Sequence, residues 1–388
     1  MARTLLDYLK TYGDVSFEHK PLGEVDSLIL CQFAYLKFDG MVPGVYDNKP
    51  FVSMEDLFIH RDYEKLFQNT WFVKKYKELF EKMYESRRFH NLRMNCYINI
   101  IEAEWETQFS AITFLLEDGS IYVAYRGTDE TIVGWKEDFN MSFMTPVPGQ
   151  SFSVKYLNMV VGKLSCPFYI GGHSKGGNLA VYAAMNCPKE VQERIIKVYN
   201  MDGPGFRPEV LENNDYSAIE EKVIKIIPHS SVVGLVFEQS DNYKVIKSKA
   251  LGLLQHDTYS WIVNYGRFVD AGPFFQGHKF ANDTMNEWIL SLEEEKRRIF
   301  VDTVYQIITA AEKDNLIELS ADWVKSLGCV TTALKEMDEP TTEALKEVLK
   351  AYVMVTQMRL KGEISRGQEK LKNKITRKKE NTKIAKQD

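Results

Sequence analysis

The sequence has few of the features that mark secreted, metal-binding or membrane proteins. Its 388 residues include only five cysteines, scattered without a Cys-x-x-Cys pair, which argues against both a disulfide framework and a zinc site. The sequence contains no run of about 18 apolar residues, which is the length needed to cross a bilayer. The first ten residues, MARTLLDYLK, contain no signal-peptide core. We therefore expect a cytoplasmic protein with free thiols and no bound metal.

Charge is distributed unevenly along the chain. The net charge is −5, but residues 359–388 carry eleven Lys/Arg against four Asp/Glu, which leaves +7 on this tail and −12 on the rest. An acidic body disfavours nucleic acid as a partner. The basic tail has the charge to contact an anionic membrane or an acidic protein, but it also fits a merely solvated helix end.

Hydrophobic periodicity divides the chain into three parts. Residues 1–92 are predicted to be mostly helical, residues 93–280 alternate strands with helices, and residues 281–388 are predicted to be helical. Strands separated by helices indicate parallel crossovers, and the Asp118-Gly119 turn signal adds an antiparallel hairpin. The sequence thus predicts an α/β fold: a mixed, mostly parallel sheet with helices on both faces and helical additions at both ends.

The segment 172–176, GHSKG, matches Gly-x-Ser-x-Gly. An apolar strand candidate, 168–170, precedes it directly, and a helix candidate, 178–185, follows it. This is the context of a nucleophile elbow, in which a sharp strand-to-helix turn exposes the serine hydroxyl. We predict Ser174 as a nucleophile. The alternative is a glycine-rich turn without chemistry.

A serine hydroxyl is a poor nucleophile without a base. In this kind of fold the order along the chain is serine, acid, histidine, so the base should lie C-terminal to the serine. His256 follows the last strand candidate and is the predicted base. His229 is the runner-up, and His278 comes later in the chain. His173 directly precedes the serine and is expected to point away from it.

The acid should end a strand between the nucleophile and the base. Asp202 ends the strand candidate 195–201 and is the predicted acid, although an aspartate before glycine also suits an ordinary turn. Asp241 lies in an expected loop and is the alternative. Asp257 follows His256 directly and is badly placed to reach its ring.

Two residues are candidates for an oxyanion hole. The N–H of Lys175 begins the helix after the elbow, where the helix end is positive. Thr128 follows the strand candidate 121–125 in the loop Arg126-Gly127-Thr128, where an early strand end supplies the second donor in such folds, and both its N–H and its hydroxyl could serve. By itself this loop also suits an ordinary turn.

Together these segments resemble the class 3, fungal-type lipases. The resemblance rests on YVAYRGT (122–128), the GWKEDF segment with Trp135 and Asp138, YIGGHSKGGNLA (169–180), NMDGPG (200–205) and the Gln255-His256 pair. Lys175 stands where a leucine is usual. An uncharacterised bacterial branch resembles the chain more closely, in its LLDYLK start and its segment 231–234.

The resemblance implies an α/β-hydrolase fold and hydrolysis of an acyl ester, lipid-like or small, by a Ser–His–Asp triad without a cofactor. The family's aspartate would fall near Ser231, where this sequence has no acid, and Asp202 could replace it from the preceding strand end. Two other functions stay open. One is a thioesterase or peptidase on the same fold, and the other is a hydrolase-like binding protein with little or no activity.

Overall fold

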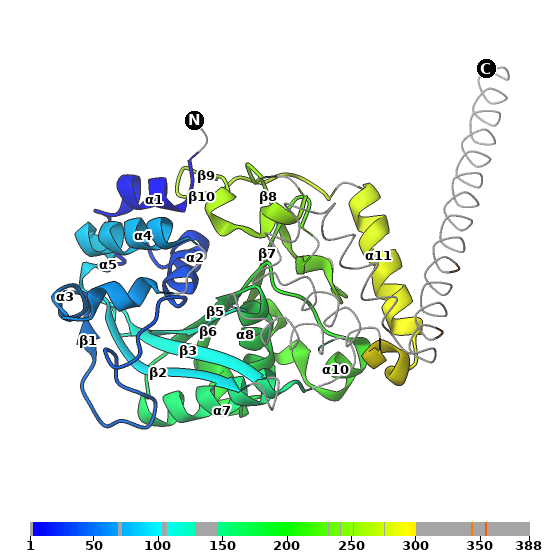
Figure 1. Cartoon of the computed structure of the whole chain (residues 1–388), viewed down its shortest axis with the longest axis horizontal. Helices are drawn as coiled ribbons and strands as arrows, with labels where there is room; N and C mark the ends of the chain where they lie inside the picture. Colours follow the sequence, from blue (N-terminus) through cyan, green and yellow to red (C-terminus); the bar gives the residue numbers. More distant parts are fainter. Residues whose placement is uncertain are drawn as a thin grey trace, which may run out of the picture.

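The computed structural model describes residues 3–299 apart from 69–71, 103–106, 129–140, 142–145, 232, 241, 251 and 275, together with residues 343 and 354. Within these residues an eight-stranded sheet runs in the order β1-β2-β3-β4-β5-β6-β7-β8 (Figure 1). Its strands are β1 (Val52–Ser53), β2 (Arg93–Glu102), β3 (Thr107–Leu115), β4 (Ile121–Tyr125), β5 (Phe168–His173), β6 (Ile195–Met201), β7 (Val223–Pro228) and β8 (Lys244–Ile246).

The sheet is mixed. Strands β1 to β4 pair antiparallel with their neighbours, and β4 to β8 pair parallel. Parallel neighbours need a crossover, which is usually helical. The crossovers contain α7 (Pro148–Lys163), α8 (Lys175–Asn186), α9 (Lys189–Arg194), α10 (Pro208–Asn213), η2 (Tyr216–Ala218) and η3 (Glu220–Lys222). The fold is therefore the α/β class that the sequence predicts.

Helices cover both faces of the sheet. On one face, α8 packs against β4, β5 and β6, and α7 packs against α8 and β3. The core there joins helix residues such as Leu157 and Leu179 to Val123 and Ile170 of the central strands. The opposite face is covered by α2 (Glu24–Phe33), which packs against the same three strands. Figure 1 shows α1, α2 and α4 on the opposite side of the sheet from α7.

Buried polar contacts hold the N-terminal region together and join it to the sheet, in addition to its apolar core. The guanidinium of Arg88 donates to both carboxylate oxygens of Asp26 at 2.7 Å, and both side chains are fully buried. The Tyr8 hydroxyl donates to the same carboxylate at 2.8 Å. Ser27 bonds to the hydroxyl of Tyr122 on β4 at 2.6 Å. The helices of this region are α1 (Leu5–Tyr12), α2, α3 (Met54–Phe58), η1 (Tyr63–Phe67), α4 (Val73–Glu85) and α5 (Arg87–His90).

The chain beyond β7 adds the strand β8 to the sheet and brings the segment around His256 beside the carboxyl ends of β6 and β7. It contains η4 (Val233–Leu235), β8, η5 (Gly252–His256), η6 (Thr258–Ser260), the hairpin β9 (Val263–Asn264) and β10 (Arg267–Phe268), and α11 (Gln276–Ser291). Most of the predicted helical region 281–388, including the basic tail 359–388, lies outside the described residues. Within those residues no helix is both long and apolar enough to span a membrane.

Several predicted boundaries agree with the structure. Strands 121–125 and 195–201 coincide with β4 and β6. The predicted helix 178–185 begins three residues earlier, at the elbow, and β5 extends to His173. The short edge strand β1 and the hairpin β9–β10 were not expected from the sequence, because runs of two residues carry no periodic signal.

Candidate active site

Ser174 lies at a sharp turn between β5, which ends at His173, and α8, which begins at Lys175. Its backbone has φ 57° and ψ −133°, a conformation that L-residues rarely adopt. The Ser174 N–H donates to the carbonyl of Met201 at 3.0 Å, which holds the turn against the end of β6. The strand–turn–helix geometry expected for a nucleophile elbow is therefore present.

The glycines around Ser174 are required by close packing. A Cβ added to Gly172 would lie 2.2 Å from the backbone of Gly176, and one added to Gly176 would lie 2.2 Å from the carbonyl oxygen of Tyr125. Backbone atoms cannot yield to such contacts. The turn is thus tight enough that side chains at these two positions would displace the strand from the helix.

Asp202 and His256 are brought together by the fold, although 54 residues separate them. The Nδ1 atom of His256 lies 2.7 Å from Oδ2 of Asp202, whose side chain is fully buried. The hydroxyl of Ser231 donates to the same oxygen at 2.9 Å. A carboxylate only accepts hydrogen bonds, so Nδ1 of His256 carries a proton in this contact, and in the neutral ring Nε2 presents its lone pair. This is the tautomer that a general base needs.

Asp202 itself has φ 54°, in the left-handed region that non-glycine residues seldom occupy. Its N–H still donates to the carbonyl of Ile226 on β7 at 2.8 Å. The residue therefore leaves β6 in a strained conformation that turns its carboxylate toward Ser231, at the end of the neighbouring strand. The resemblance expects an acid near Ser231. In this chain the Ser231 hydroxyl instead donates a hydrogen bond to the Asp202 carboxylate.

The loop that carries His256 is held by Gln255, which is completely buried. The side-chain oxygen of Gln255 accepts from the N–H of Ser230 at 2.9 Å, and its backbone carbonyl accepts from the indole N–H of Trp261 at 2.8 Å. The bond from Ser230 attaches η5 to the segment that follows β7, and the bond from Trp261 holds η5 against the residue after η6. The side chain of His256 remains 26% exposed, so solvent reaches the ring.

His173 contacts the same loop. Its Nε2 lies 3.1 Å from the backbone carbonyl oxygen of His256, and the two ring centroids are 4.5 Å apart. Its Nδ1 lies 3.3 Å from the hydroxyl of Tyr35, at the end of α2. Burial, and after it the neighbouring His256, hold the pKa of His173 well below its ordinary value of 6.5. The sequence analysis expects His173 to point away from Ser174 and gives it no role. The structure places it against the predicted base, His256.

The described residues show no hydrogen bond between the Ser174 hydroxyl and the His256 ring. The structure brings the predicted acid and base together and places the elbow beside them, but the serine–histidine contact is not formed. Such bonds are often long in unliganded sites and shorten when the substrate binds. The pairing of Ser174 with His256 thus stays a prediction.

The loop with Thr128 lies beside the elbow. A Cβ added to Gly127 would be 3.2 Å from Cβ of Ser174 and 2.5 Å from the carbonyl oxygen of His173. Thr128 follows directly and is half-buried. The side chain of Lys175 is buried, and its ammonium group donates to the carbonyl of Gln108 on β3 at 3.0 Å. Any contribution of Lys175 to an oxyanion hole would therefore come from its backbone N–H.

The other candidates are placed elsewhere or fall outside the described part. Nε2 of His229 faces the amide of Gln255 at 3.2 Å and not Asp202. Asp257 forms an ion pair with Lys75 at 3.0 Å and caps η6. The structure does not describe Trp135, Asp138, Asp241 or the side chain of His278.

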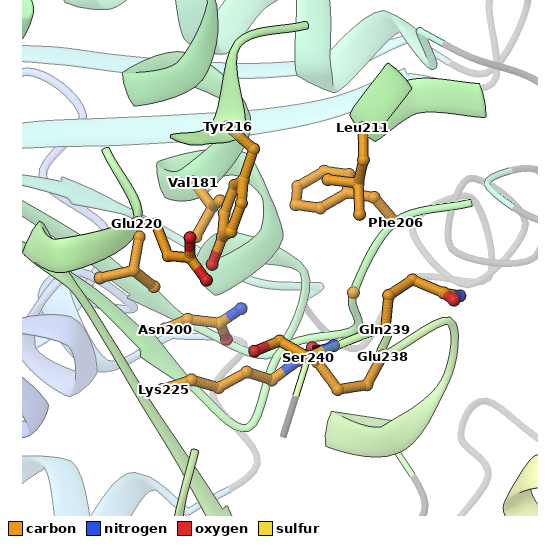
Figure 2. Close-up of a pocket in the computed structure, with 12 residues that line it drawn as sticks. Val181, Asn200, Phe206, Leu211, Tyr216, Glu220, Lys225, Glu238, Gln239 and Ser240 are labelled. Carbon is orange, nitrogen blue, oxygen red and sulfur yellow. Dashed lines mark hydrogen bonds and ion pairs between the residues drawn. The ribbon is translucent and has the colours of Figure 1, made fainter. Parts of the chain in front are cut away.

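A separate cavity of about 260 Å³ lies on the α8 face of the sheet. Figure 2 shows Tyr216, Phe206 and Leu211 facing Lys225 and Ser240 across it. Lys225 forms a nearly buried ion pair with Glu238. All five predicted site residues lie within the described part, and none of them lines this cavity, so it is distinct from the surroundings of Ser174.

A strained serine at a strand-to-helix turn, at the carboxyl edge of a largely parallel sheet and next to a buried Asp–His pair, defines an α/β-hydrolase fold. Within that class the chain belongs to the Mbeg1-like family, whose model matches residues 83–306, more than half of its length. No curated protein matches it.

One solved structure, described as the crystal structure of M37 lipase, aligns with 55% of this chain and 68% of its own at 14% identity and a TM-score of 0.36. At that TM-score the likeness bears on neither the site nor the substrate.

Proposed function

We propose that this protein is a serine hydrolase that cleaves an acyl ester of a lipid-like or small substrate, with Ser174, His256 and Asp202 as its triad. The observation that carries the proposal is the 2.7 Å contact between Asp202 Oδ2 and His256 Nδ1 beside a strained serine. Buried Asp–His pairs of this kind are what orient an imidazole to accept the proton of a serine.

In the proposed reaction, Ser174 Oγ attacks the ester carbonyl while His256 Nε2 takes its proton. The buried carboxylate of Asp202 stabilises the imidazolium, and Ser231 fixes that carboxylate. The backbone N–H groups of Lys175 and Thr128 stabilise the oxyanion. The imidazolium then protonates the leaving alcohol, and a water molecule activated by His256 hydrolyses the acyl-enzyme.

A second candidate is a binding protein on the same fold with little or no catalytic activity. The absent hydrogen bond between Ser174 and His256 favours it. A thioesterase or peptidase would use the same atoms as the proposed esterase. The kinetic constants for different acyl groups separate these chemistries, because each enzyme discriminates by kcat/KM.

Fluorophosphonate labelling tests the proposal directly. We expect a labelled wild-type protein, no label in Ser174→Ala, and full label in the matched control Ser217→Ala, whose hydroxyl bonds only to exposed Asp215. His256→Gln should lose labelling, whereas His90→Gln, a histidine beside Tyr84, should keep it. A well-folded wild-type protein that neither takes the label nor hydrolyses p-nitrophenyl esters, thioesters or peptides would refute the enzyme and leave the binding protein.

A further inference from the structure

We infer that Tyr35 and His173 are positioning residues that hold the catalytic imidazole of His256 in place. The inference rests on the proposed function and adds a residue from the N-terminal region, outside the matched segment 83–306. His173 is 8% exposed and lies between the Tyr35 hydroxyl and the backbone carbonyl of His256. Its ring is thus the link between α2 and the loop of the proposed base.

The direction of each hydrogen bond follows from the acceptor at one end. A backbone carbonyl only accepts, so Nε2 of His173 carries the proton and donates to His256 at 3.1 Å. In a neutral imidazole the other nitrogen, Nδ1, is then an acceptor, and the Tyr35 hydroxyl donates to it at 3.3 Å. The chain of bonds runs from Tyr35 through His173 to His256, and it uses both nitrogens of the ring.

The ring must stay neutral to do this. A protonated His173 could not accept from Tyr35, and its charge would lie against a ring that itself becomes cationic during the proposed reaction. Burial and the proximity of His256 disfavour that charge by lowering the pKa of His173. His173 therefore acts as an uncharged spacer against one side of His256, while Asp202 binds its Nδ1.

The fold fixes Tyr35 on this spot. Tyr35 follows α2, which is anchored by the buried Asp26–Arg88 pair. A Cβ added to Gly127 would be 2.3 Å from the Tyr35 hydroxyl and 3.2 Å from Cβ of Ser174. The hydroxyl, the oxyanion loop and the nucleophile therefore meet at one point, where only a glycine leaves enough room.

We call the hydrogen bonds from Tyr35 through His173 to His256 the relay. Its loss would let the His256 imidazole shift while the triad residues remain. A displacement of about 1 Å at a reacting group lowers the rate by about 100-fold. We expect Tyr35→Phe to lower kcat on p-nitrophenyl butyrate by about 10-fold and His173→Leu by about 100-fold, with KM changed less than about twofold. His173→Gln keeps a donor for the His256 carbonyl and should regain part of the rate lost in His173→Leu.

A double-mutant cycle tests whether Tyr35 acts through His173. In the His173→Leu background, Tyr35→Phe should have no further effect on kcat. The matched control is Tyr156→Phe on α7, which removes a buried hydroxyl bonded to the Cys96 carbonyl and Thr113 and should leave kcat unchanged. Imidazole ¹⁵N NMR of the full-length protein should show neutral His173 protonated on Nε2, with the Nδ1 signal moving in Tyr35→Phe.

The outcomes distinguish the relay from the function on which it rests. A wild-type protein without hydrolysis that depends on Ser174 would refute both. Hydrolysis that depends on Ser174 but is unchanged in Tyr35→Phe, or additive losses in the double variant, would overturn the relay alone. An Nδ1-protonated His173 would overturn it as well, whatever the activity.

Discussion

Asp202→Asn tests the acid of the proposed triad most directly. Oδ2 of Asp202 accepts from Nδ1 of His256 and from the Ser231 hydroxyl. An asparagine that placed its NH₂ group there would face the Nδ1–H donor, and the ring would have to move its proton to Nε2. In that tautomer the imidazole cannot accept the proton of Ser174, so the general base is lost although the side chains keep their places.

The structure favours that orientation of the amide. The other oxygen, Oδ1, has no hydrogen-bond partner within the described residues, and a Cβ on Gly234 would lie 2.3 Å from it. An NH₂ group placed there would be buried and unsatisfied, at a cost of about 1–3 kcal/mol, whereas the Ser231 hydroxyl can rotate to accept from NH₂ at the Oδ2 position. We expect kcat to fall about 10⁴-fold, the size of the same change in a serine protease triad. That loss corresponds to about 5.5 kcal/mol in the barrier.

The assay is steady-state hydrolysis of p-nitrophenyl esters, with urea unfolding of the same samples to establish that the variant folds. Asp215→Asn is the matched control, because Asp215 is an exposed aspartate that caps η2. A folded Asp202→Asn protein that keeps more than about a tenth of the wild-type kcat would refute the tautomer argument. The acid role would then pass to Asp241 or to no residue.

Three further predictions concern stability. Ser174→Gly should raise the free energy of unfolding by about 1 kcal/mol, because glycine relieves the strain at φ 57°. Ser174→Ala keeps the Cβ and should raise this free energy less. Equal free energies for the two variants in urea unfolding would contradict the strain argument. Arg88→Met should lower the same free energy by about 3–5 kcal/mol, because it removes the guanidinium that donates to both oxygens of the buried Asp26 carboxylate and leaves the Lys20 ammonium, 3.8 Å away, as its ion-pair partner among the described residues; a loss below about 1 kcal/mol would show that the pair is dispensable. His173 has a lowered pKa in the folded state and binds its proton more readily when unfolded. Its contribution to stability should therefore be constant above about pH 7 and be lost as the pH falls below about 6.5, by up to about 1.4 kcal/mol per pH unit. A wild-type protein and His173→Gln with the same pH dependence between pH 7.5 and 5 would contradict that assignment.

Much of the fold could be predicted because the central strands are continuous apolar runs. Strand β4 is buried at every position, as strands covered on both faces are, and such a run stands out against its turns. The elbow could be predicted for a related reason, since its glycines and its place between a strand and a helix are local properties of the sequence.

The rest of the site depends on contacts between distant segments. Nothing in the residues near Asp202 shows that its backbone adopts φ 54° or that His256 lies within hydrogen-bonding distance. Tyr35 has no motif around it, and its contact with His173 exists only because α2 packs on the central strands. The sequence shows that His173 directly precedes Ser174, but it does not show that the His173 side chain contacts Tyr35 and the backbone of His256.

The position of Asp202 also bears on how relatives of this protein are sorted. Adjacent parallel strands end side by side, about 4.8 Å apart, so a carboxylate leaving either strand can reach one imidazole. A sequence screen that required an acid after β7 would classify this chain as inactive. The carboxylate of Asp202, which follows β6, nevertheless contacts the His256 ring. For members of this family, the presence of a carboxylate bound to the histidine ring is a better criterion than the presence of an acid at one aligned position.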